Sequence, residues 1–212
     1  AFNSKRNGDN DIYVMPAGGG KSRRLTYSEL DDYICSWSSN SQNILFASRR
    51  NLRYPNYRVL YEIPLRGGTP QPVMKILANR GVYSSSQDKI LYVRDGVKWW
   101  RKGYHGSGAG SVWMFDTTTN EHTYISHRKK HQFGGDFQQP QVDWPMWGAD
   151  NSIYVTAEWD GTFNLYKRTE SSDSWEQITH YKGDGLRFPS ISKDGNVIAF
   201  EHGMDIYTLE GD

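Results

Sequence analysis

The sequence has almost no cysteine and no long hydrophobic run. Cys35 is the one cysteine among 212 residues, so no disulfide can form within the chain. It lies in DDYICSW, an alternating pattern that predicts a small buried side chain rather than a reactive thiol. No apolar segment approaches the ~18–20 residues of a membrane-spanning helix, so we expect no membrane span. These features leave the periplasm or cell envelope and the cytoplasm equally open.

The chain also lacks an excess of charge and a recognisable nucleophile motif. Lys and Arg number 25 against 24 Asp and Glu, a net charge of +1, which predicts no nucleic-acid partner. No G-x-S-x-G occurs, so no catalytic residue is predicted. The GSGAGS segment at Gly106–Ser111 leads into a strand pattern rather than a helix, which favours a loop over a phosphate-binding site.

Three histidines, His122, His127 and His131, are close in sequence but fall in a basic loop. A zinc site needs its ligands on rigid elements, so we predict a solvated loop and no metal. NGDND and EWDGTFN lack the alternating carboxylates and the closing Glu of a calcium loop, and are interpreted as hairpin turns. No cofactor is predicted.

Aromatic residues are abundant, and they mark a sequence repeat that occurs five times. Each copy has an apolar strand, a tight polar turn and a second strand centred on an aromatic. The second strands, DIYVM, VLYEI, SVWMF, NLYKR and DIYTL, are centred on Tyr13, Tyr61, Trp113, Tyr166 and Tyr207. The preceding strands are centred on Phe46, Tyr92, Tyr154 and Phe200. A period of about 40–50 residues built from short strands predicts an all-β fold, a β-propeller of four-stranded antiparallel blades.

The blades are predicted at residues 1–27, 28–73, 74–126, 127–181 and 182–212, within a single propeller domain or fragment. No helix is expected, because period-2 patterns and Gly, Asp, Asn and Ser turns run through the chain. The first copy lacks its innermost strand and the last lacks its outermost strand. We therefore expect an incomplete ring of about four and a half blades, whose bare ends favour association or a homo-oligomer.

Three stretches resemble the six-bladed propeller of tricorn-type serine proteases, within the wider group of TolB-like repeats. DIYVMPAGGGKSRRLTY is similar to its second blade, and WWRKGYHGSGAGSVWMFD to its fourth. PMWGADNSIYVTAEWDGTFNLYKR and QITHYKGDGLRFPSISKDGNVIAFEHGMDIYTL resemble blades five and six, whereas RRNLRYPNYRV departs from the pattern. The resemblance implies a non-catalytic propeller that gates or binds peptides, docks protein partners and accompanies a catalytic protease domain of the same polypeptide.

The best candidate for peptide binding is an aromatic and basic run. It contains Trp99, Trp100, Arg101, Lys102, Tyr104 and His105, and a second basic loop one blade earlier carries Arg49 and Arg53. Aromatic rings can stack on peptides, and guanidinium groups bind carboxylates through paired hydrogen bonds. The alternative is that one Trp packs between blades while the charges face water.

Two other functions stay open at this point. One is a stand-alone TolB-like propeller that acts as a protein-protein interaction scaffold in the cell envelope. The other is the propeller cap of a prolyl-oligopeptidase-type hydrolase. Sequence following Asp212 would separate them, because a protease core, a stop codon and an α/β-hydrolase nucleophile motif each point to a different answer.

Overall fold

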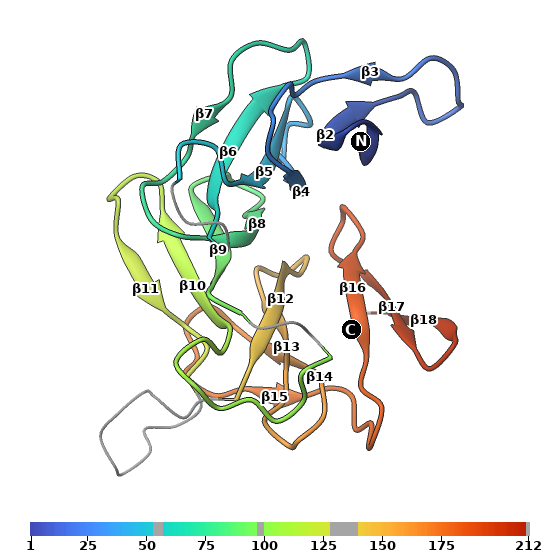
Figure 1. Cartoon of the computed structure of the whole chain (residues 1–212). Helices are drawn as coiled ribbons and strands as arrows, with labels where there is room; N and C mark the ends of the chain where they lie inside the picture. Colours follow the sequence, from blue (N-terminus) through green and yellow to red (C-terminus); the bar gives the residue numbers. More distant parts are fainter. Residues whose placement is uncertain (53–56, 97–99, 128–139, 211–212) are drawn as a thin grey trace. The chain divides into compact units, whose positions relative to one another are not determined.

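The computed structural model describes residues 1–52, 57–96, 100–127 and 140–210. Every regular element in these ranges is a β-strand, as the period-2 patterns predict (Figure 1). The strands form five antiparallel sheets, three with four strands and two with three, and this succession of meandering sheets is the all-β blade topology of a β-propeller. The chain divides into two compact units, residues 1–92 and 93–212, and each is described by itself.

The first two sheets lie entirely within residues 1–92, and the third contains strands from both sides of residue 92. The first contains β1 (Phe2–Asn7), β2 (Asp9–Val14) and β3 (Arg23–Arg24). The second contains β4 (Asp32–Trp37), β5 (Asn43–Ser48), β6 (Val59–Pro64) and β7 (Gln71–Pro72). The third sheet contains β8 (Asn79–Tyr83), β9 (Lys89–Arg94), β10 (Ser111–Asp116) and β11 (His122–Tyr124).

The two remaining sheets lie within residues 93–212. The fourth sheet contains β12 (Val142–Trp147), β13 (Ile153–Ala157), β14 (Asn164–Arg168) and β15 (Glu176–Gln177). The fifth contains β16 (Arg187–Ile191), β17 (Val197–His202) and β18 (Asp205–Glu210). In the described part of the chain, the first and fifth sheets therefore have one strand fewer than the others, as the mismatched ends predict.

The five aromatics of the repeat occupy equivalent strands, which confirms their predicted alignment. Tyr13, Tyr61, Trp113, Tyr166 and Tyr207 lie in β2, β6, β10, β14 and β18. Where a further strand follows, each aromatic faces the residue eleven positions later: Arg24, Pro72, Tyr124 and Gln177. On the other side Phe2, Phe46 and Phe200 face Tyr13, Tyr61 and Tyr207, but Tyr166 faces Val155 rather than Tyr154. Ladder pairing, rather than the position of the aromatic, sets this register.

A side-chain hydroxyl joins the last two strands in three of the sheets. The N–H of Ile12 donates to Thr26 Oγ1 at 3.0 Å, and that of Leu165 donates to Thr179 Oγ1 at 2.9 Å. The N–H of Val112 donates to Ser126 Oγ at 3.0 Å. All three hydroxyl residues are buried. The hydroxyl continues the ladder by one step where the outer strand has ended.

The turns between the two innermost strands also repeat. Each has one residue with positive φ at the same place: Ser41 (57°), Gln87 (63°), Asn151 (59°) and Gly195 (77°). Gly195 packs so closely on Ala149 that a Cβ atom would lie 2.2 Å from its backbone nitrogen. Only glycine fits there, because both the backbone angle and the space exclude a side chain.

Each unit has its own apolar core between neighbouring sheets. In residues 1–92 the first two sheets pack through Ile12, Leu25, Phe46 and Tyr61. In residues 93–212 the fourth and fifth sheets pack through Met146, Leu165, Leu186 and Phe200, among others. Cys35 is half-buried in β4, and burial raises the pKa of its thiol to about 11, so the thiol stays protonated at neutral pH.

Candidate functional site

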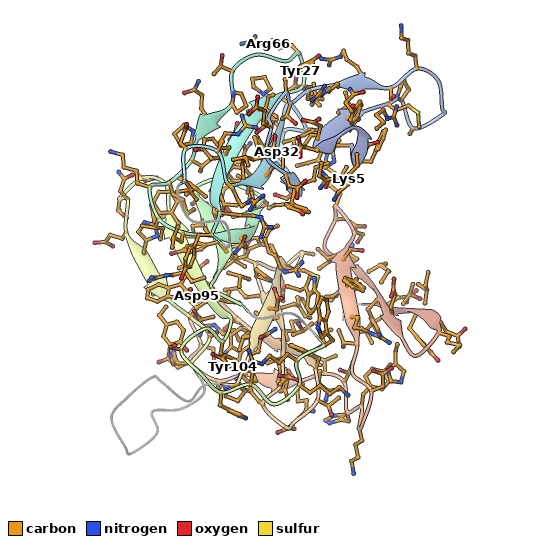
Figure 2. All side chains as sticks on the ribbon, in the orientation of Figure 1. Lys5, Tyr27, Asp32, Arg66, Asp95 and Tyr104 are labelled. Atoms are coloured by element: carbon orange, nitrogen blue, oxygen red, sulfur yellow. The ribbon has the colours of Figure 1, made fainter. Side chains whose placement is uncertain are left out.

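The predicted basic segments fall in different units. Arg49 follows β5 in residues 1–92, whereas Trp100, Arg101, Lys102, Tyr104 and His105 follow β9 in residues 93–212. Arg53 and Trp99 lie outside the described residues. Figure 2 shows Tyr104 on the loop between β9 and β10, which we call the basic loop (residues 100–110).

The basic loop is organised around Tyr104. The Arg101 guanidinium carbon lies 4.4 Å from the centre of the Tyr104 ring, and the Gly108 N–H donates to the Tyr104 hydroxyl at 3.4 Å. Gly106 touches the same ring, and a Cβ atom there would lie 2.3 Å from the hydroxyl oxygen. Arg101, Lys102 and His105 are exposed, and Trp100 is 61% exposed. The loop therefore presents cationic and aromatic groups to solvent.

Lys102 ties the basic loop to the connection between the fourth and fifth sheets. Its Nζ donates to the carbonyl of Gly183. A few residues further along that connection, the Leu186 N–H donates to the Phe163 carbonyl at 3.0 Å. A Cβ atom on Gly185 would lie 2.8 Å from the Phe163 backbone, so glycine permits this close approach. Three loops of residues 93–212 are thus joined by direct contacts.

Beneath these loops lies a buried carboxylate. Glu158 directly follows β13 and is 3% exposed. Burial raises the pKa of Glu158, and the Gly103 N–H and the charges of Lys102 and His105 only partly offset this. The site therefore combines exposed cations with one shielded anion.

Aromatic rings form the apolar part of the same region. The ring of Trp144 meets Phe163 at 5.9 Å and Phe188 at 5.7 Å, both edge to face. Phe188 is 45% exposed. Trp144 and Phe188 have positive φ values of 46° and 49°, which bulky residues rarely adopt. Bulges in β12 and β16 place these two rings, and sequence patterns alone gave no sign of either.

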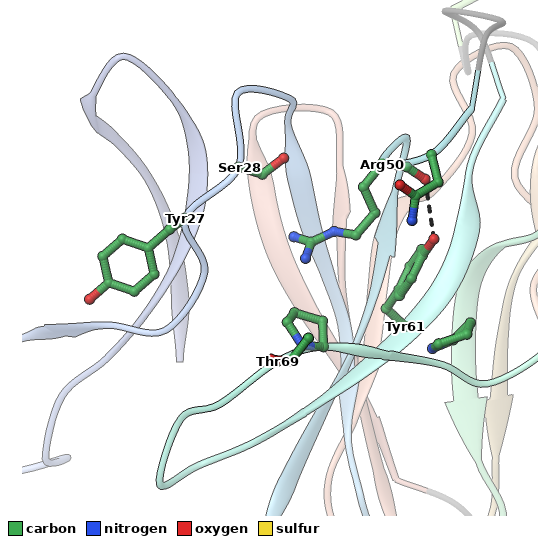
Figure 3. A pocket seen from close by; sticks show the side chains of 8 residues that line it. Tyr27, Ser28, Arg50, Tyr61 and Thr69 are labelled. Carbon is green, nitrogen blue, oxygen red and sulfur yellow. Dashed lines mark hydrogen bonds between the residues drawn. The ribbon is translucent and has the colours of Figure 1, made fainter.

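The unit of residues 1–92 has a separate open pocket of about 380 Å3 (Figure 3). Its lining residues are Tyr27, Ser28, Arg50, Asn51, Tyr61, Thr69, Pro70 and Pro72. The Tyr61 hydroxyl donates to the Arg50 carbonyl at 3.1 Å, and the Arg50 guanidinium binds the buried Asp32. Arg50 is therefore held by the protein itself and is less suited to bind a ligand carboxylate.

Arg49 is adjacent in sequence to the pocket residue Arg50, and its charge lowers the pKa of Asp31. Burial alone would raise the pKa of Asp31, but the Asn10 N–H, the Tyr33 hydroxyl and the charges of Lys5 and Arg49 hold it below its usual value.

Of the histidines, His122 stacks on Phe115 and His127 lies 3.5 Å from Asp173, while His131 lies outside the described residues. Within the described residues no group of three or more metal-ligating side chains occurs.

The whole chain, residues 1–212, matches the family described as the tricorn protease N-terminal beta propeller domain. The chain belongs to this family. A tricorn-family relative, Tricorn protease homolog 1 of Streptomyces coelicolor, is 22% identical over 215 residues, which cover 99% of this chain and 19% of the relative. The chain thus spans about a fifth of that protein's length.

Solved structures agree on the fold of this tricorn-family propeller. The crystal structure of the tricorn protease aligns with a TM-score of 0.76 and 17% identity, over 95% of this chain and 19% of that one. TolB from Acinetobacter baumannii aligns with a TM-score of 0.72 and 14% identity, over 95% of this chain and 46% of that one. At these identities the likeness shows the fold alone. In the part of the chain that the structure describes, no helix is long and apolar enough to cross a membrane.

Proposed function

We propose that this chain is the non-catalytic propeller of a tricorn-type serine peptidase and that it binds peptides at the basic loop. Family membership supports the enzyme class. The observation that carries the binding site is the contact of Lys102 with Gly183, which joins the loop of the exposed Arg101 and His105 to the connection that leads into β16 and Phe188. Cations beside exposed rings suit the free carboxylate and the apolar side chains of short peptides.

Each group has a distinct role in this proposal. Arg101 and His105 bind the carboxylate, and Trp100 and Phe188 contact apolar side chains. Lys102 and Tyr104 position the loop, because their polar groups already bond within the protein. Arg49 and Arg53, which follow β5 in the sequence, are assigned a separate role in the docking of protein partners.

The proposed assembly places these five blades in one domain, within a six-bladed ring. The natural protein supplies the remaining blades and a catalytic protease domain, which acts as the functional partner. We expect the 212 residues by themselves to leave a fluorogenic peptide uncleaved. Cleavage that disappears on mutation of a residue within 1–212 would contradict this.

The binding proposal is tested with a dye-labelled pentapeptide, measured by fluorescence anisotropy with a free and with an amidated C-terminus. We expect the free acid to bind better, and R101Q and H105A each to weaken binding by about tenfold, the loss of about 1.4 kcal/mol. K193Q, which changes an exposed cation in the turn after β16, is the matched control. Equal binding by R101Q, H105A and wild type would refute the site.

A further inference from the structure

Two aromatic residues of the inner strands β12 and β16 have a backbone conformation that is unfavourable for bulky side chains. Trp144 has a φ of 46° and Phe188 a φ of 49°. Each is followed by proline, Pro145 or Pro189, which favours an extended backbone at the residue before it. Glycine or asparagine would adopt a positive φ at lower energy, so an aromatic residue at these positions strains the backbone.

The bend itself belongs to the fold, because it recurs in three inner strands. Arg80 in β8 also has a positive φ, of 47°. Arg80, Trp144 and Phe188 each lie four residues before the N–H that closes the next hairpin, which belongs to Ser84, Gly148 and Ser192. Arginine, tryptophan and phenylalanine thus occupy one backbone position. The backbone therefore does not dictate an aromatic ring there, and the reason for each side chain lies in what it contacts.

Packing in the core explains Trp144 better than Phe188. Trp144 is 7% exposed, and its N–H, which lies at the bulge in β12, donates to Asp143 Oδ1 at 2.7 Å. Phe188 is 45% exposed. Burial therefore offsets much less of the backbone strain at Phe188 than at Trp144. A strained backbone that presents an exposed side chain is a feature of binding sites.

The Phe188 ring is supported by two buried rings. Trp144 contacts it at 5.7 Å with 81° between the ring planes, and Phe163 contacts Trp144 at 5.9 Å with 78°. Phe163 is 4% exposed, and its carbonyl accepts the Leu186 N–H at 3.0 Å. A ring that is already held in this way loses little freedom when a ligand ring packs on it. The arrangement is therefore preorganised for binding.

The charges beside Phe188 favour a neutral ligand group at this ring. The guanidinium of Arg187 lies 3.1 Å from the Asp184 carboxylate, which balances its charge. The ammonium group of Lys102 binds the Gly183 carbonyl in the same connection. A cationic side chain on the Phe188 ring would meet this second cation, which opposes the attraction of a cation to the ring. A neutral ring meets no such repulsion.

We propose that Phe188 is a specificity-determining residue and that it selects peptides with an aromatic side chain. The inference rests on the proposed peptide binding at the basic loop, which holds the carboxylate while the aromatic side chain packs on Phe188. Two aromatic rings attract each other beyond the effect of the area that they bury. A saturated ring of the same size lacks this contribution, so it should bind more weakly.

An uncharged ligand tests Phe188 separately from the basic loop. N-acetyl-phenylalaninamide and N-acetyl-cyclohexylalaninamide are similar in size, both lack a carboxylate, and only the first is aromatic. In NMR titrations of the 212-residue chain, we expect the first to shift the signals of the Phe188 amide and the Trp144 indole. It should bind at least about threefold tighter than the second. Equal affinity, or no shift at either residue, would overturn the inference whatever the result for R101Q.

Variants then assign the preference to one ring. We expect it to disappear in F188L, which keeps an apolar side chain, and to persist in F188W. The matched control is Y27L, which removes a 75% exposed aromatic from residues 1–92 and should keep the preference. R101Q should leave the affinity for the uncharged amide unchanged. A preference that survives in F188L, or an R101Q effect as large as that of F188L, would overturn the inference.

The same pair of side chains in the dye-labelled pentapeptide connects Phe188 to the proposed function. With phenylalanine and cyclohexylalanine exchanged at one position at a time, we expect one position at which phenylalanine binds at least about threefold tighter. This difference should vanish in F188L. Equal binding at every position would overturn the aromatic selection while leaving carboxylate binding intact. Equal binding of free-acid and amidated peptides would instead refute the proposed function, and the uncharged amide would still decide the role of Phe188.

Discussion

The first and second sheets attach their last strand in the same way but bury different side chains beside it, polar in the first sheet and apolar in the second. In both, the last strand sends one N–H back to the preceding strand, from Leu25 to Ile12 at 2.8 Å and from Val73 to Leu60 at 2.9 Å. Beside this bond the first sheet buries Asp11 and Thr26, whereas the second has Val59 and Met74. The backbone register is constant while the side chains change as a pair. Changing both members together should therefore cost less than the sum of the two single changes.

The largest effect should come from loss of the cation that pairs with Asp11. Arg24 Nη2 lies 2.5 Å from the fully buried Asp11 carboxylate. Replacing Arg24 with Met leaves that charge unpaired, and we expect the free energy of unfolding to fall by about 3 kcal/mol. Urea unfolding measures this, with R66A at an exposed turn as the control, expected within about 0.5 kcal/mol of wild type. An R24M effect no larger than that of R66A would mean that Asp11 needs no cation.

Removal of the hydroxyl should cost less. Thr26→Val leaves the Ile12 N–H and Asp11 without this partner, so we expect a loss of about 2 kcal/mol in unfolding free energy. The double variant D11V/T26M copies the second sheet. Its cost should be at least about 1 kcal/mol smaller than the sum of the single variants, measured in the same urea experiments. Additive costs would show that the two positions are independent.

The reverse change in the second sheet should be smaller still. Met74→Thr places a hydroxyl near Leu60 but removes buried apolar volume, and Val59 offers it no acceptor. We expect a loss of about 1 kcal/mol by thermal or urea unfolding. Greater stability of M74T than wild type would show that the backbone N–H alone determines the preference for Thr.

The smallest effect concerns Glu158, a buried acid without the guanidinium partner of Asp11. Burial raises its pKa above the unfolded value, so its ionisation destabilises the fold as pH rises through the folded pKa. Glu158→Gln removes this penalty. We expect the stability of E158Q relative to wild type to increase from about pH 4 to about pH 8. A difference that does not change with pH would mean that Glu158 has the same pKa in the folded and unfolded states, so that a partner offsets its burial.

Much of the fold could be predicted from the sequence, because its signals are local. Alternation of apolar and polar residues predicted the strands, and the repeated aromatic predicted the position of the third strand in each four-stranded sheet. The pairing of Tyr166 with Val155 instead of Tyr154 could not be predicted, since the ladder between β13 and β14 sets the register and the aromatic positions do not. The basic loop was visible as a run of charges, but its contact with Gly183 joins residues 81 positions apart.

The site shows the same limit. An acid directly after an alternating strand, as in IYVTAE, was a signal for Glu158, yet the groups that act on its carboxylate, the Gly103 N–H and the Lys102 charge, come from the distant basic loop. Phe188 lies in β16 at a bulge, where its backbone has a positive φ and its ring is exposed. Long-range packing of this kind leaves no periodic trace in the sequence.

By itself, the sequence determined the strands and their turns, because hairpins form between neighbours in the chain. Only the tertiary structure decided which repeats are buried. Asp-Ile-Tyr is written at Asp11 and again at Asp205, yet Ile12 is 0% exposed and Ile206 is 77% exposed. The local sequence is the same, and the difference is the strand and sheet beside it, since burial is a property of neighbours rather than of the residue.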